Sequence, residues 1–178
     1  MPILAGLALA LGLFALYVAT RPAAFRITRS LVVGAPAAAI FPLINNFREW
    51  VKWSPWEKLD PNMKKTYDGA ESGVGASYHW VGDKSGEGKM TLTESVPDSR
   101  VVIDLHFIKP FPANNNTVFT LEPEGEGTRV TWTMDGQNSF VAKAFNVVMN
   151  MDKLVGADFE KGLAAMATAA TAATTTAD

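Results

Sequence analysis

The 178-residue sequence contains no cysteine and only two histidines, His79 and His106. The absence of cysteine excludes disulfides, thiol catalysis and thiolate metal sites, and it leaves the cellular compartment open. The two histidines fall on different expected strands, and the sequence has no HExxH motif or similar pair of ligands. We therefore expect no metal site, no cofactor and no histidine-based catalytic site.

Charge is also scarce. Charged residues make up 19% of the chain, the formal net charge is -2 and the pI is near 5.7. Nucleic-acid binding needs a basic stripe that neutralises phosphates, so we exclude nucleic acid as a partner. The sequence has no G-x-S-x-G nucleophile motif. The segment GAESGVG at 69–75 precedes an expected strand and lacks the Lys-Ser/Thr ending of a phosphate loop, so we interpret its glycines as turn residues.

The first twenty residues, MPILAGLALALGLFALYVAT, form an uninterrupted apolar run with no charged side chain. At about 1.5 Å per residue, a helix over 3–20 spans about 27 Å, close to the hydrocarbon thickness of a bilayer. A cleaved signal peptide is the alternative, but the run lacks a basic start, and no convincing Ala-x-Ala cleavage site precedes the RPAAF that follows it. We therefore expect residues 1–21 to be a single-pass anchor in the inner (plasma) membrane.

The charges after this run indicate its orientation. Three arginines follow it closely and none precedes it: Arg21, Arg26 and Arg29. By the positive-inside tendency, they favour a cytoplasmic location for the rest of the chain.

Seven segments alternate apolar and polar residues, with turn residues between them. They are 25–34, 64–69, 75–82, 88–96, 100–108, 116–123 and 128–134. The last two flank Gly125-Glu126-Gly127, which is a hairpin signal. Because the last six segments are consecutive and joined by short loops, we expect an antiparallel sheet.

Helical patterns lie on either side of the six consecutive strands. Two short helices are expected within 35–53, the first shortened or broken by Pro42. A long helix is expected over 139–166, because apolar residues recur there at three- and four-residue steps. These residues are Val141, Phe145, Val148, Val155, Phe159, Leu163 and Met166, and Asp152 falls within the same stripe. The small-residue segment 167–178 has nothing to bury, so we expect it to be disordered.

This order of elements predicts an α+β domain over residues 22–166. A seven-stranded antiparallel sheet would curl, and the long helix would lie across its concave face. A strongly curved sheet closed by a single helix is difficult to fill with side chains, so we expect an apolar hollow between the two.

Several segments carry a family resemblance when taken in order: APAAAIFPLINNFREWVKWSPW, ESGVGASYHWVG, GEGKMTLTES, TRVTWTMDG and NMDKLVGADFEKGL. Together they resemble membrane-anchored bacterial members of the SRPBCC superfamily, which are polyketide cyclase/dehydrase-like proteins that share the helix-grip fold of START lipid-transfer domains. The resemblance covers about 22–166. It implies a ligand-holding cavity between sheet and helix, and it implies no particular reaction.

Apolar side chains at the inward positions are the candidate ligand-binding residues. They are Tyr78, Trp80, Met90, Leu92, Phe107, Trp132, Met134, Met149 and Phe159. A solid core is the alternative, since most aromatic residues at core periodicity are core. Flexible methionines and amphipathic aromatic rings also line adaptable apolar sites. The expected fold favours a cavity wall.

Two further features of the sequence suggest ligand contacts. The stretch EWVKWSPWEKLDP contains three tryptophans, and we expect Trp53 and Trp56 at the cavity mouth, with a plug over the core as the alternative. Asp152 would face the apolar interior, where an unpaired carboxylate is costly. It would either orient a polar ligand group or, in the structural interpretation that we favour, accept indole N–H bonds or pair with a basic side chain at the helix edge.

These features favour non-catalytic binding of a hydrophobic small molecule or lipid by a membrane-tethered domain. An enzyme similar to polyketide cyclases or dehydratases is the first alternative, and it would need a polar pair inside the pocket. An interaction module that assists another membrane protein is the second. The sequence leaves the oligomeric state and the identity of the ligand open.

Overall fold

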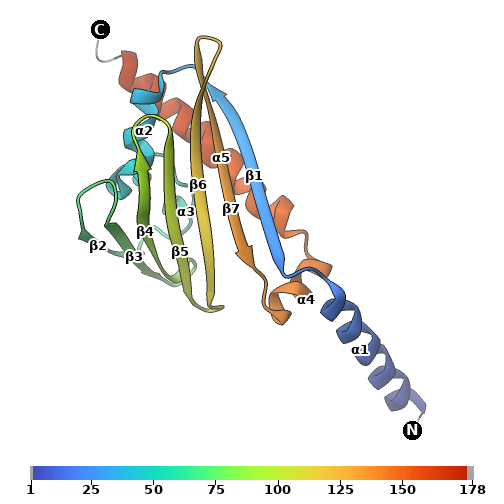
Figure 1. The fold of residues 1–178 in the computed structure, drawn as a ribbon. Coiled ribbons are helices and arrows are strands. Elements are labelled where there is room, and N and C mark those ends of the chain that lie inside the picture. The colour runs from blue at the N-terminus through green and yellow to red at the C-terminus, as the bar shows by residue number, and fades with distance from the viewer. Residues whose placement is uncertain (1, 176–178) are drawn as a thin grey trace.

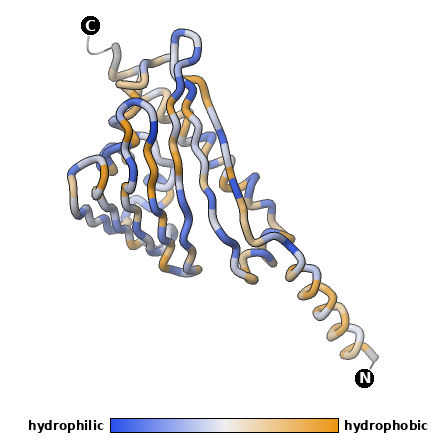
Figure 2. The backbone as a smooth tube through the Cα atoms, viewed as in Figure 1, coloured by the Kyte–Doolittle hydropathy of each residue, from blue (hydrophilic) through white to orange (hydrophobic). Residues whose placement is uncertain are grey.

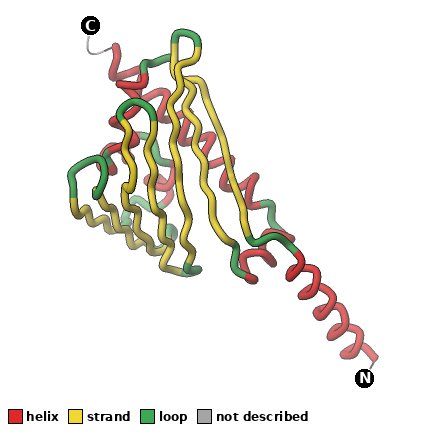
Figure 3. The backbone as a smooth tube through the Cα atoms, in the orientation of Figure 1, coloured by secondary structure: helices red, strands yellow, loops and turns green. Residues whose placement is uncertain are grey.

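The computed structural model describes residues 2–175. Its helices are α1 (Pro2–Thr20), α2 (Ala37–Asn45), the 3-10 helix η1 (Phe47–Lys52), α3 (Pro55–Leu59), α4 (Phe140–Val148) and α5 (Met151–Thr175). Its strands are β1 (Ala24–Val33), β2 (Lys64–Gly69), β3 (Ala76–Gly82), β4 (Gly86–Val96), β5 (Arg100–Lys109), β6 (Ala113–Glu124) and β7 (Gly127–Gln137). Figure 1 and Figure 3 show one curved sheet with α2, α3 and α5 behind it and α1 extending away from it.

The seven strands form one antiparallel sheet in the order β1-β7-β6-β5-β4-β3-β2. Strands β2 to β7 are sequential neighbours, and β1 joins the sheet by pairing with β7. Helix α5 lies on one side of the sheet and contacts β1 and α2 (Figure 1). The predicted α+β helix-grip fold is therefore confirmed.

Helix α1 extends away from the sheet as an apolar rod (Figure 1 and Figure 2). Ile3–Thr20 is long and apolar enough to cross a membrane, and nearly all of its side chains are exposed. These properties fit a membrane span, and a signal sequence at the same position would share them.

The short helices differ slightly from expectation. Helix α2 continues through Pro42 without a break, and the second predicted helix is a 3-10 helix. Helix α3 was not predicted; it begins at Pro55, which suits a first helical position because proline has no N–H to leave unpaired. These helices lie at one end of the interior and bury Ile40, Ile44 and Trp50.

The predicted single helix over 139–166 is two helices. Met149 has extended backbone angles, φ -121° and ψ 127°, and Asn150 Oδ1 accepts a hydrogen bond from the Lys153 backbone N–H. Asn150 therefore caps a new helix. The break divides the apolar stripe: Phe159, Leu163 and Met166 are buried, whereas the part on α4 is exposed.

Helix α5 also continues beyond the predicted end of the domain. It runs to Thr175, and Ala170 is fully buried in the core. The expected disorder from Ala167 is therefore wrong as far as Thr175, because alanine has the highest helix propensity and this segment has a surface to bury. Residues 176–178 lie outside the described residues.

Candidate functional site

The interior beside η1 and α3 is filled by aromatic rings. Trp132 and Phe159 stack with ring centroids 4.0 Å apart and an interplanar angle of 4°. Trp53 is 1% exposed, lies 5.5 Å from Trp132 and donates its indole N–H to the Leu43 carbonyl oxygen at 2.7 Å. The expected position of Trp53 at a cavity mouth is therefore wrong. Trp53 lies in the core, which agrees with the alternative that this stretch plugs the core. Trp56 is partly buried at the edge of the core, with its ring centroid 5.7 Å from that of Trp132.

A different part of the concave face is less tightly closed. Strand register aligns one row of residues across the sheet: Phe25, Gly136, Asn115, Leu105, Met90, Tyr78 and Tyr67. We call this set the concave row. Phe25, Leu105 and Tyr67 in this row are only partly buried, as is Phe107 further along β5. The row therefore offers an apolar surface that is not completely covered by the helices.

Two polar side chains interrupt this apolar surface. Asn115 and Thr117 are both buried on β6, and neither Asn115 Oδ1 nor Thr117 Oγ1 has a hydrogen-bond partner among the described residues, 2–175. The indole N–H of Trp132 is likewise buried and unpaired. Buried polar groups are normally hydrogen-bonded, so these three groups have capacity left for a polar atom of a ligand.

The interior also contains an ion pair. The Lys65 ammonium on β2 donates to the Glu57 carboxylate on α3, whose side chain is almost fully buried. The Tyr78 hydroxyl donates to Glu57 Oε1 at 3.1 Å. Burial, together with the Glu57 charge, raises the pKa of Tyr78 far above its ordinary value, so this phenol stays protonated. Sequence analysis missed this cluster, because its members are far apart and none is a motif.

Asp152 does not face the interior. It is exposed and pairs with Arg29 on the edge strand β1, at 3.2 Å, while Arg29 also binds Glu160 at 2.8 Å. The hydrogen bond to Asp152 is the main cause that raises the pKa of Arg29. The interpretation of Asp152 as a structural residue, paired with a basic side chain, matches this geometry. The pair attaches α5 to β1, and Gly156 leaves room for the guanidinium.

The remaining predicted ligand-binding residues fall into two groups. Most lie in the core or at its edge, seven of them on the concave face of the sheet and Phe159 on α5; these eight residues are Tyr78, Trp80, Met90, Leu92, Phe107, Trp132, Met134 and Phe159. Met149 does not join them, because it lies exposed in the connection between α4 and α5. Ligand binding by these residues stays a prediction.

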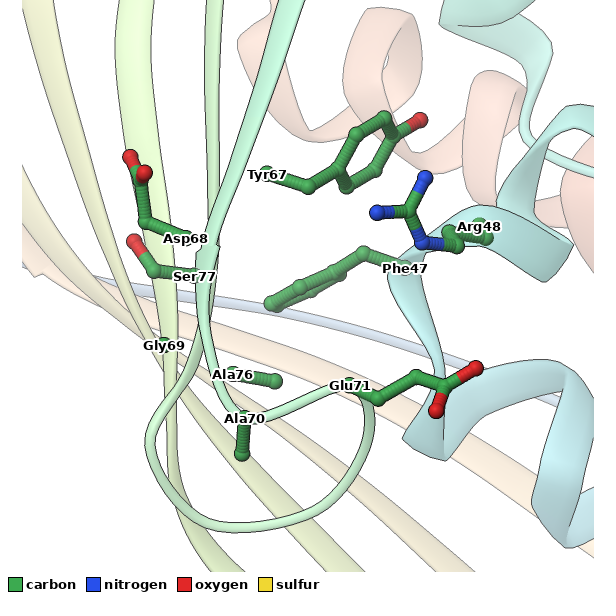
Figure 4. Close-up of a pocket in the computed structure, with 9 residues that line it drawn as sticks. All are labelled: Phe47, Arg48, Tyr67, Asp68, Gly69, Ala70, Glu71, Ala76 and Ser77. Atoms are coloured by element: carbon green, nitrogen blue, oxygen red, sulfur yellow. The ribbon is translucent and has the colours of Figure 1, made fainter.

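A pocket of about 410 Å³ lies beside the concave row, between η1 and the β2–β3 loop (Figure 4). Its wall includes Phe47 and Arg48 from η1, with the Arg48 guanidinium 4.4 Å from the centroid of the Tyr67 ring. Gly69 at the end of β2 and Gly73 and Gly75 in the loop have positive φ, so the glycines of GAESGVG act as turn residues. The wall of this pocket is mainly polar, and Tyr67 of the concave row forms part of it.

A second, more open cavity of about 590 Å³ lies at one end of β1, β5, β6 and β7. Its wall combines Phe25, Asn115 and Gly136 of the concave row with polar side chains that include Asp104 and His106, which are exposed as predicted. Within residues 2–175, no group of three or more histidine, aspartate or glutamate side chains converges in a way that could hold a metal ion.

A curved antiparallel sheet that holds a C-terminal helix, with an apolar concave face between them, defines a helix-grip ligand-binding domain of the SRPBCC type. The chain belongs to the family described as polyketide cyclase / dehydrase and lipid transport, whose model matches residues 24–171. The resemblance of residues 22–166 to the SRPBCC superfamily is thus confirmed.

Solved structures of several bacterial proteins share this fold. CV1439 from Chromobacterium violaceum is 18% identical, with a TM-score of 0.57 over 83% of this chain and 96% of that one. A Thermobifida fusca protein is 25% identical, with a TM-score of 0.57 over 80% of this chain and 90% of that one. DynU16, from the dynemicin biosynthetic locus, is 14% identical, with a TM-score of 0.54 over 80% of this chain and 46% of that one. The comparison with curated proteins found no match.

Proposed function

We propose that this protein binds a hydrophobic small molecule or lipid on its concave face without chemical conversion, while α1 tethers the domain to the membrane. One observation carries the proposal: the concave row combines partly exposed apolar side chains with a buried, unpaired Asn115 Oδ1. Ligand sites commonly pair an apolar wall with a few polar groups that fix orientation. The family, which includes lipid transport in its description, supports the same conclusion.

The unpaired groups indicate the chemistry of the ligand. Thr117 Oγ1 and Trp132 Nε1 are neutral, and the nearby Arg29 is already bound by two carboxylates. A ligand with an apolar body and an uncharged hydrogen-bonding group, such as a hydroxyl or carbonyl, suits this wall better than an anion.

The tether and its orientation belong to the same proposal. Helix α1 has the length and composition of a membrane span, and the arginines that follow it favour a domain on the cytoplasmic side of the inner membrane. A tether of this kind keeps the concave face beside the bilayer, where hydrophobic ligands dissolve.

An enzyme that acts on a polyketide-like substrate is the second candidate, and the Glu57–Lys65–Tyr78 cluster favours it. The cluster supplies the interior polar pair that such an enzyme needs. Its groups bind one another rather than facing an open position, and this favours binding without catalysis. Substrate turnover that is lost in both Glu57→Gln and Tyr78→Phe, with both variants folded, would establish the enzyme instead.

Native mass spectrometry of the full chain, released from membranes in detergent, tests the proposal. We expect bound mass that disappears after organic extraction. Leu105→Trp fills the concave row and should abolish the bound mass, whereas Val32→Trp, at an exposed position on β1, should retain it. No bound mass on the wild type, or equal bound mass on Leu105→Trp, would contradict binding at this site.

A further inference from the structure

Helix α4 exposes the apolar stripe that an ordinary surface helix would bury. Val141, Phe145 and Val148 follow one another at steps of four and three residues, so they share one face of the helix. Their residues are 51%, 50% and 76% exposed, and no residue of α4 is buried. An amphipathic helix with an uncovered apolar face has a partner that is not part of the domain itself.

Neighbouring apolar side chains extend this stripe into a patch. The Phe111 ring, in the turn between β5 and β6, lies 6.0 Å from the Phe145 ring and is 63% exposed. Phe140 and Met149, at the two ends of α4, are also about half exposed. We call Phe111, Phe140, Val141, Phe145, Val148 and Met149 the interfacial patch.

The patch lies where α1 ends. The Lys143 ammonium on α4 donates to the backbone oxygens of Ala19 and Arg21, at 3.1 Å each. Helices α1 and α4 contact each other, and Val18 is fully buried (Figure 1). The Arg21 guanidinium lies 4.8 Å from the centroid of the Tyr17 ring, and such aromatic and basic side chains gather at the boundary between lipid and water.

We propose that the interfacial patch inserts into the surface of the same bilayer that α1 crosses, and this inference depends on the membrane tether proposed above. Because Lys143 fixes α4 to the last residues of α1, a membrane-spanning α1 holds α4 at the depth of the lipid headgroups. Phe145 and Val148 then meet acyl chains, while Lys143 and Arg21 meet phosphates. The bilayer therefore covers the apolar face, and it fixes the orientation of the domain as well as its position.

Site-specific fluorescence on the full chain in phosphatidylcholine vesicles tests this inference. The wild type has no cysteine, so single cysteines can carry an environment-sensitive dye without a background mutation. The test sites are Val148→Cys and Phe111→Cys. Val74→Cys is the matched control, because it is 59% exposed and lies in the β2–β3 loop. Leu9→Cys, within α1, reports the tether itself.

We expect a blue shift at positions 148 and 111, and loss of their fluorescence when lipids carry a quencher at a shallow acyl position. Interfacial helices bury their apolar face about 5–10 Å deep, so a quencher deep in the bilayer should act less strongly at 148 than at 9. Position 74 should show neither effect.

If the dyes at positions 148 and 111 behave like the dye at position 74 while the dye at position 9 is quenched, the patch proposal is wrong and the proposed tether stands. If 9 is not quenched, the tether fails first. A blue shift at 148 without quenching by lipid would indicate a second protein surface and would also overturn the proposal.

Discussion

The buried hydroxyl of Thr117 provides the most direct test of the binding wall. Thr117 is 4% exposed, its neighbours across the sheet are Met134 and Ile103, and its Oγ1 has no hydrogen-bond partner in the part of the chain that the structure describes. A buried polar group without a hydrogen bond costs about 1–3 kcal/mol. Thr117→Val keeps the shape and removes the hydroxyl. The ligand-free variant should therefore be more stable, by about 1 kcal/mol, which raises Tm by about 2–4 °C for a chain of this size.

The same substitution should weaken binding. If a polar group of the ligand forms a hydrogen bond with Thr117 Oγ1, removing the hydroxyl costs about 0.5–1.5 kcal/mol of binding free energy, so the dissociation constant rises roughly 2- to 13-fold. Thermal unfolding by circular dichroism after lipid extraction measures the first effect, and titration with a fluorescent monoacylglycerol measures the second. Thr133→Val is the control, because Thr133 binds Thr28 Oγ1 on the other face of the sheet and should leave affinity unchanged. A lower Tm for Thr117→Val would show that the hydroxyl is already satisfied, and unchanged affinity would place the ligand elsewhere.

Two further predictions concern the stability of the domain, one through packing and one through its dependence on pH. Phe159→Ala should lower the free energy of unfolding in urea by about 3–5 kcal/mol, since Phe159 is 1% exposed and stacks on Trp132. Phe145→Ala, measured in detergent, should change it by less than about 0.5 kcal/mol, because Phe145 is exposed on α4. Equal losses in the two variants would refute the division of the apolar stripe into a buried part on α5 and an exposed part on α4. Hydrogen bonds from the backbone N–H groups of Lys84 and Ser85 lower the pKa of Asp60. The stability that these hydrogen bonds supply is present above the ordinary aspartate pKa, about 3.9, and disappears as pH falls through the lower pKa of Asp60 in the folded protein. Asp60→Asn should therefore flatten the acid side of the Tm–pH curve. Parallel curves for the wild type and the variant would contradict this role of Asp60.

Local patterns predicted the sheet because alternation alone decides which side chains point inward. In β5, Val101 and Ile103 are buried and Asp104 and His106 are exposed, as their positions predicted. The antiparallel order then followed from short loops and hairpin signals, and the helix-grip class from the resemblance.

The site was harder to predict, because its features depend on contacts between distant residues. Glu57, Lys65 and Tyr78 have no informative spacing, and only the fold brings them together. Periodicity alone assigned Asp152 to the interior, since it could not show that Arg29 would draw the start of α5 to the edge of the sheet. One local signal was present and missed: Asn150 is a favourable N-cap, and it marks the start of a separate helix.

The pairing of β1 with β7 has a consequence for how the chain assembles. Ala24 lies opposite Gln137, so the first strand made after α1 borders the last strand of the sheet. During synthesis the meander from β2 to β7 can form step by step, whereas β1 has no neighbour until almost the entire domain has emerged. Folding of this sheet therefore finishes, rather than begins, at the strand that follows α1, and a chain that stops before Gly127 leaves both β1 and one edge of β6 without a partner strand.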